Sequence, residues 1–119
     1  ERFENLPPAK HPRFYGAQRF TLNVTRADMA RAGWSPSVRL FEAAACATPV
    51  ISDWWDGLDA FFVPDREILI AETADDVLRH LRDGDRAIGA RARERVLREH
   101  TADHRAAQLE GLMREVVPV

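Results

Sequence analysis

The fold is decided by one stretch of the chain, which reads Gly33-Trp34-Ser35-Pro36-Ser37-Val38-Arg39-Leu40-Phe41-Glu42-Ala43-Ala44-Ala45-Cys46-Ala47-Thr48-Pro49-Val50-Ile51-Ser52-Asp53. This stretch predicts a capped helix, a tight turn and a short buried strand. We expect Ser35 to cap the helix, because a serine hydroxyl accepts a hydrogen bond from a free N–H group of the first turn. Pro36 then falls at the first helical position, where its missing N–H group is not needed.

The amino-terminal end of this helix is a candidate anion site. The N–H groups of Ser37, Val38 and Arg39 have no partner within the predicted helix, and such a helix end attracts phosphate. At a rise of about 1.5 Å per residue, Glu42 lies roughly 7–8 Å along the axis from Ser37. A diphosphate and a ribose are separated by a similar distance. The alternative is an ordinary core helix with one exposed glutamate, and the spacing alone leaves both interpretations open.

The composition is that of one globular domain. The chain has 119 residues, of which 45% are hydrophobic and 30% charged, and these values are ordinary for such a domain. The formal net charge of −2 gives no indication of nucleic acid or an anionic membrane as a partner. No apolar run approaches the roughly 20 residues of a membrane span, and no signal peptide is recognisable. Cys46 is the single cysteine, which favours a reducing, cytoplasmic compartment.

Strands and helices alternate along the chain. We predict strands at 20–24, 49–52 and 67–71, with the tail of another at 2–4. We predict helices at 11–18, 73–82, 85–100 and 101–117, a helical turn at 58–62, and a short helix or loop at 25–32. The apolar faces expected to be buried comprise Val77, Leu78 and Leu81, then Ile88, Ala92 and Val96, and finally Leu109, Leu112, Met113 and Val116. This alternation predicts an α/β fold with a parallel sheet flanked by helices.

The predicted topology brings the candidate site to one edge of the sheet. Ligands of open parallel sheets bind at the carboxyl ends of the strands. Segments 24–35 and 53–57 both leave such ends, and the helix that begins at Ser35 opens on the same edge. Arg26 and Arg39 could offset phosphate charge there. Arg39 could equally face solvent or form an ion pair with Asp53.

The two tryptophans at positions 54 and 55 have two possible roles. Trp54 and Trp55 follow a strand, where they could stack on a base or a sugar or cover the core.

His100 and His104 are four residues apart, but the pair lacks further zinc-type ligands, and Thr101 between them is better explained as a helix cap. We therefore expect no metal site.

Cys46 lies in an apolar run. A cysteine in such a run is normally an inert packing residue, so we do not expect it to act as a nucleophile.

Three runs of sequence carry a family resemblance: Thr21-Leu22-Asn23-Val24-Thr25-Arg26, the segment from Ser35 to Cys46, and Thr48-Pro49-Val50-Ile51-Ser52-Asp53. They resemble the carboxyl-terminal part of group 1 glycosyltransferases, in particular the branch that includes spore-maturation-type proteins. The similarity continues at Gly57-Leu58, Pro64, Glu67-Ile68-Leu69 and His100-Thr101, and covers nearly the whole chain. It implies two Rossmann-like, three-layer domains, of which residues 1–119 would be the latter part of the carboxyl-terminal, nucleotide-sugar-binding one. The start at Glu1 rather than methionine also leads us to expect a fragment of a longer protein.

The resemblance also implies roles for individual residues. Glu42 matches a glutamate that bonds the donor ribose, and the N–H groups of Ser37 and Val38 match those that meet the diphosphate. The implied donor-binding set is Ser35, Ser37, Val38, Arg39, Glu42 and Arg26, and the loop on the sugar side comprises Asp53, Trp54 and Gly57. The family usually has a second glutamate, which contacts the donor sugar, eight residues before the first. This chain has Trp34 at that position.

We therefore predict the donor-binding part of a glycosyltransferase that moves a sugar from a nucleotide diphosphate to an unknown acceptor. The helix end with Arg26 or Arg39 would stabilise the leaving diphosphate without a metal or other cofactor. The acceptor site and any catalytic base would belong to a missing amino-terminal domain, so we expect the isolated fragment to be inactive. The alternative, which Trp34 favours, is a non-catalytic transferase-like module for partner binding or assembly.

Overall fold

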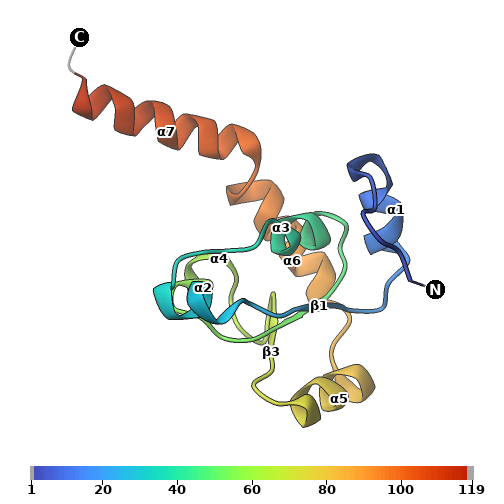
Figure 1. Cartoon of the computed structure of the whole chain (residues 1–119). Helices are drawn as coiled ribbons and strands as arrows, with labels where there is room; N and C mark the ends of the chain where they lie inside the picture. Colours follow the sequence, from blue (N-terminus) through green and yellow to red (C-terminus); the bar gives the residue numbers. More distant parts are fainter. Residues whose placement is uncertain (1, 118–119) are drawn as a thin grey trace.

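The computed structural model describes residues 2–117, which form a mixed α/β fold around a small parallel sheet (Figure 1). Its three strands are β1 (Thr21–Asn23), β2 (Val50–Ser52) and β3 (Leu69–Ile70), in the order β1-β2-β3. The register pairs Thr21 with Val50 and Ile51 with Leu69, both in parallel. This arrangement is compatible with a Rossmann-like glycosyltransferase fold, and it confirms the predicted parallel sheet.

The helices follow the order predicted from the sequence. They are the 3-10 turn η1 (Pro8–Lys10), α1 (His11–Gly16), α2 (Ala27–Ala32), α3 (Val38–Ala45), α4 (Leu58–Phe61), α5 (Ala74–Asp83), α6 (Ile88–Glu99) and α7 (Ala102–Val116). Segment 25–32, which the sequence left open between helix and loop, is therefore helical over most of its length. The strand predicted at 2–4 is absent from the described residues, and Phe3 instead packs edge-on against Phe14 of α1.

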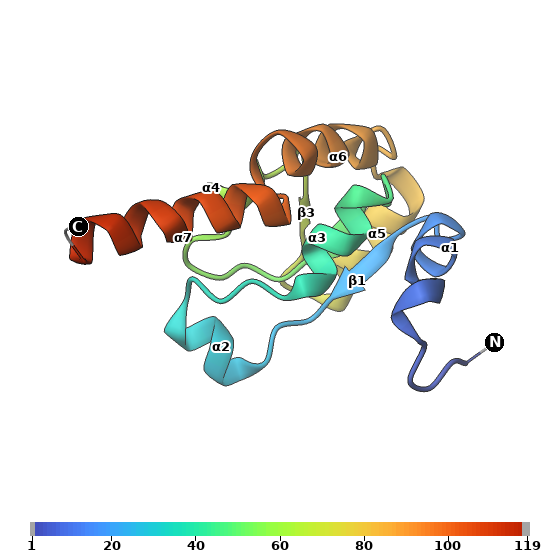
Figure 2. The same cartoon turned by 90° about the horizontal axis from the view of Figure 1, so that it is seen from above.

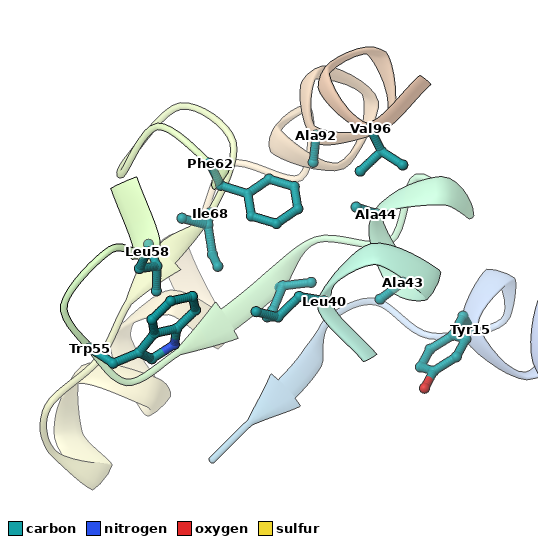
Figure 3. Close-up of a cluster of buried hydrophobic side chains, with 11 residues drawn as sticks. Tyr15, Leu40, Ala43, Ala44, Trp55, Leu58, Phe62, Ile68, Ala92 and Val96 are labelled. Carbon is teal, nitrogen blue, oxygen red and sulfur yellow. The ribbon is translucent and has the colours of Figure 1, made fainter. Parts of the chain in front are cut away.

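The main core lies where α3 packs against the sheet and α6. Leu40, Ala43 and Ala44 of α3 are fully buried, and they meet Ala92 and Val96 of α6 (Figure 3). Small alanines at the contact allow the two helices to approach closely, as ridge-into-groove packing requires. The loop and strand residues that complete this core are Val50, Trp55, Leu58, Phe62 and Ile68. The core therefore fixes the start of α3 relative to β2.

A second, smaller cluster lies on the opposite face of β2. Consecutive strand residues point to opposite faces of a sheet, so Val50 joins the main core while Ile51 packs with Leu69 and Ile88. Val77 of α5 covers this cluster in part. The prediction that Leu78 and Leu81 also face the core is wrong, because both are exposed. The two-residue strand β3 offers too little sheet surface for α5 to bury its whole apolar face.

Helix α7 extends away from the body of the protein (Figures 1 and 2). The prediction that it is buried through Leu109, Leu112, Met113 and Val116 is wrong, because all four are exposed. The Thr101 cap turns the chain between α6 and α7, and this turn carries α7 beyond the other described elements. None of the described helices is long and apolar enough to cross a membrane.

Candidate functional site

Helix α3 begins later than the sequence suggests. Its cap is Ser37, whose Oγ accepts a hydrogen bond from the Arg39 N–H group at 3.3 Å. Ser35 and Pro36 lie in the preceding loop, so the prediction that Ser35 caps the helix is wrong. The Trp34 N–H group donates to the Asp56 carbonyl at 2.7 Å, and this bond between two loops holds the chain in a non-helical path until Ser37.

Glu42 lies on the second turn of α3, where its carboxylate is partly exposed and faces α1. Its Oε2 atom lies 3.3 Å from Nδ1 of His11. The other ring nitrogen of His11, Nε2, lies 3.0 Å from the Leu6 carbonyl, to which it can only donate. The sequence does not single out His11 as a neighbour of Glu42, because no local spacing relates a residue on α1 to one on α3.

Tyr15 adds a phenol to this part of the site. Its ring packs edge-on against His11 with centroids 6.0 Å apart. Burial, followed by the negative charge of Glu42, raises the pKa of Tyr15 above its ordinary value. Tyr15 therefore keeps its proton at neutral pH and presents a hydroxyl beside the Glu42 carboxylate.

An open groove of about 410 Å³ runs between α1 and the outer edge of β1. Apolar and aromatic side chains line much of it, among them Leu6, Phe14 and Tyr15, while His11 and Arg39 supply polar groups. His11 thus contacts both the groove and Glu42. The surface that lines this groove is more polar than apolar, because Gln18 and Thr21 also contribute to it.

Arg39 reaches back toward the carboxyl end of β1. Its side chain is exposed, and its Nη1 lies 3.5 Å from Oδ1 of Asn23. Asn23 is buried and also donates to the Ser52 hydroxyl at 3.1 Å, which ties the ends of β1 and β2 together. Arg26 lies at the cap position of α2 and is exposed, and the structure does not join it to Arg39.

Asp53 connects the loops that follow β1 and β2. Its Oδ1 accepts hydrogen bonds from both the N–H group and the hydroxyl of Thr25, each at 2.9 Å. The ion pair with Arg39 that the sequence left open is therefore not formed. The two loops do meet at the carboxyl edge of the sheet, as the topology predicted.

The aromatic residues of this edge divide into packing and exposed groups. Trp55 is only 2% exposed and belongs to the main core, whereas Trp54 is 40% exposed. Trp34 is 66% exposed and lies against Gly57, where an added Cβ would come within 2.5 Å of the indole. Of the predicted sugar-side residues, Gly57 is thus in contact with the loop that precedes α3.

The two histidines near α7 are held by intramolecular contacts. His100 donates through Nε2 to the Phe61 carbonyl at 2.9 Å, and Arg105 donates to its Nδ1 at 2.6 Å. His104 forms a capping box with Thr101, which confirms Thr101 as a helix cap. Within residues 2–117, no group of three or more possible ligands is arranged to hold a metal ion.

Cys46 is partly buried at the end of α3. Burial, followed by the charge of Glu42, raises the pKa of the Cys46 thiol. Because the thiolate is the nucleophilic form, this environment supports a packing role.

Comparison with known proteins identifies a family. A model of the family described as glycosyl transferase-like matches residues 1–111. No curated protein and no solved structure gives a significant match. The match covers most of the chain and does not distinguish the spore-maturation-type branch.

Proposed function

Because the chain belongs to the glycosyl transferase-like family, we propose that it forms the donor-binding part of a transferase and holds a nucleotide diphosphate sugar at the carboxyl edge of its sheet. The observation that carries this proposal is the position of Glu42 one turn beyond the start of α3. A carboxylate accepts hydrogen bonds from the hydroxyl groups of a ribose, while a helix start favours phosphate. The wider domain would then be Rossmann-like and three-layered, as in group 1 enzymes.

The diphosphate would lie at the start of α3. The Arg39 N–H group already donates to the Ser37 hydroxyl, so the Ser37 and Val38 N–H groups would be the donors to phosphate. Arg39 is exposed at the same edge and supplies a positive charge. Such fixed donors and charges stabilise the negative charge that develops on the leaving diphosphate when the glycosidic bond breaks. No metal is needed for this role.

The ribose and base would lie on the side of α3 that faces α1. Nδ1 of His11 lies 3.3 Å from the Glu42 carboxylate, and His11 also lines the groove of about 410 Å³. With the ribose on Glu42, the base would enter this groove and contact Phe14 and Tyr15. The acceptor and any catalytic base would come from another part of the same protein, so residues 1–119 alone would not transfer sugar.

A second function is a non-catalytic module that uses the same fold to bind a partner. The feature that favours it is Trp34, since the resemblance to group 1 enzymes leads us to expect a sugar-contacting glutamate at this position. Such a module would bind no nucleotide at the start of α3.

Calorimetric titration of UDP, GDP and ADP into the full-length protein separates the two functions. We expect at least one nucleotide to bind, and Glu42→Ala to weaken binding by about tenfold or more, because hydrogen bonds to a charged group contribute roughly 1.5–3 kcal/mol. Glu94→Ala, which removes an exposed carboxylate from α6, is the matched control and should change nothing. Donor binding is refuted if no nucleotide binds or if the Glu42 variant binds as well as the wild type.

A further inference from the structure

His100 lies at the junction between α6 and α7. It follows Glu99, the last residue of α6, and precedes Thr101, the cap of α7. Nε2 of its ring lies 2.9 Å from the Phe61 carbonyl, and Nδ1 lies 2.6 Å from Nη2 of Arg105, on the first turns of α7. We propose that this junction is a pH-sensitive hinge, which the neutral imidazole of His100 holds closed and which protonation of that ring opens.

The two partners of the ring fix its protonation state. A carbonyl oxygen only accepts and a guanidinium group only donates, so Nε2 carries the single ring proton and Nδ1 offers its lone pair to Arg105. A proton at Nδ1 removes this acceptor. It also places an imidazolium beside the guanidinium of Arg105, and like charges at such a distance repel each other. The bond from Arg105 to His100 is therefore lost when the imidazole is protonated.

Few other contacts hold the start of α7 against the body of the protein. Nη1 of Arg105 lies 3.5 Å from the Glu99 carbonyl, and its other partner, Gln108, belongs to α7 itself. Beyond its first turns α7 projects away from the other elements (Figures 1 and 2). Its apolar side chains there are exposed, namely Leu109, Leu112, Met113 and Val116. Within residues 2–117, packing further along α7 therefore does not replace the bond to His100.

The surroundings of the imidazole oppose the charged form. Three phenylalanine rings have centroids 5.7 to 6.0 Å from the centroid of the imidazole, and they are Phe41, Phe61 and Phe62. Burial is the main cause that lowers the pKa of His100 below its ordinary value of 6.5. Opening of the hinge exposes the ring and returns its pKa toward that value. Uptake of a proton therefore favours the open state as pH falls below 6.5.

Charged groups on both helices face the imidazole. Arg105 of α7 and Arg95 of α6 add to the effect of burial, whereas the hydrogen bond to the Phe61 carbonyl and the charge of Glu99 oppose it. The Glu99 carboxylate is shared, because it lies 2.6 Å from Arg95 and 3.0 Å from Arg98. It is therefore not free to stabilise an imidazolium at the junction.

The hinge determines the direction in which the exposed apolar face of α7 points. The helix has 15 residues. A helix of this length is about 22 Å long, so a rotation of about 20° at the junction moves its far end by about 8 Å. A change in the protonation of one side chain is thus converted into a displacement that can be measured.

The test measures the distance between the two helices by double electron–electron resonance in the full-length protein. Nitroxide labels are attached through Glu94→Cys on α6 and Glu115→Cys on α7, two exposed positions, after Cys46→Ala and replacement of any other cysteine. We expect the distances to shift and broaden by about 5–8 Å between pH 7.5 and pH 5.0. His100→Gln should show no such change. Arg105→Ala should give the distances of the open state even at pH 7.5.

His104→Gln is the matched control. Nδ1 of His104 accepts the Thr101 N–H group at 3.2 Å, and glutamine keeps an acceptor at this position of the capping box. The response to pH should persist in this variant, and circular dichroism at both pH values checks that each variant remains helical.

The hinge is overturned if the wild-type distances are the same at both pH values, or if His100→Gln responds as the wild type does. Loss of the response in His104→Gln would assign it to His104 and overturn the role of His100. If His100→Gln does not fold, Arg105→Ala decides the question. Distances in Arg105→Ala at pH 7.5 that match the wild type at pH 7.5 would show that the bond to His100 does not hold α7.

Discussion

Nδ1 of His11 lies 3.3 Å from Oε2 of Glu42, although the two residues belong to helices far apart in the sequence. Because Nε2 of the same ring donates to the Leu6 carbonyl, Nδ1 can donate to the carboxylate only when the imidazole carries both protons. The imidazole lies beside the Glu42 carboxylate and belongs to α1, the same helix that lines the groove. The candidate site is therefore built from two segments that only the folded chain brings together.

Replacement of His11 tests whether this contact prepares Glu42 for a ligand. His11→Ala removes the ring beside the carboxylate and frees the carboxylate to rotate, so we expect nucleotide affinity in the full-length protein to fall by about three- to tenfold, because ordering one side chain on binding costs about 0.5–1.5 kcal/mol. The loss should be smaller than that caused by Glu42→Ala. Arg13→Ala, on the exposed side of the same helix, is the control. An unchanged affinity in His11→Ala would show that Glu42 does not depend on His11.

The bond between Asp53 and Thr25 should contribute measurably to stability. Asp53→Ala removes the acceptor of two hydrogen bonds that join the loops after β1 and β2. We expect the free energy of unfolding, measured in urea, to fall by about 1–3 kcal/mol. Asp53→Asn keeps Oδ1 as an acceptor and should cost less. Equal losses in the two variants would mean that the charge, rather than these hydrogen bonds, carries the effect.

Replacement of two helical glycines by alanine should change the stability of the protein in opposite directions. Gly89, in α6, lies so close to the Ala47 carbonyl that an added Cβ would be 2.1 Å from its oxygen, whereas Gly111, in α7, has nothing within 4 Å. Gly89→Ala must therefore displace α6 from the turn after α3, and we expect a loss of about 1–3 kcal/mol. Gly111→Ala should stabilise the protein by up to about 1 kcal/mol, because alanine has the higher helix propensity. Thermal unfolding of both variants checks the signs, and destabilisation by Gly111→Ala would show that α7 is covered at this position.

His100 should make stability depend on pH near neutrality. Burial is the main cause that lowers the pKa of His100 below its ordinary value of 6.5. The unfolded chain then binds a proton at a higher pH than the folded chain does, so the stabilising effect is complete above pH 6.5 and is lost as pH falls toward the folded pKa. We expect the free energy of unfolding to decrease between pH 7 and pH 5.5, and this slope to be shallower in His100→Gln.

The carboxylates with lowered pKa values, Asp76, Asp85 and Glu99, act in a more acidic range. Their contribution is present above their ordinary values, near 4, and is lost as pH falls through the lower folded values. They therefore do not obscure the interval in which His100 titrates. An identical slope in the wild type and His100→Gln between pH 7 and pH 5.5 would contradict the assignment.

Local signals were sufficient where one residue and its near neighbours decide the structure. The helix predicted at 73–82 begins at a capping box of Thr73 and Asp76, whose partners lie within one turn of each other. The prediction that Ser35 caps α3 is wrong because the cap depends on a contact from outside this segment. Serines lie on both sides of Pro36, and the choice between them depends on the bond from Trp34 to Asp56, which no local pattern records.

The sequence by itself determined the order of strands and helices, the parallel sheet, and the buried face of α6, because these follow from periodicity and capping within short segments. It also contained the resemblance that the family match confirmed at the level of glycosyltransferases. Only the tertiary structure decided that His11 faces Glu42, that Trp55 is buried while Trp34 and Trp54 are exposed, and that α7 has an uncovered apolar face. Each of these depends on which distant segment packs against a side chain, and periodicity identifies an apolar face without identifying what covers it.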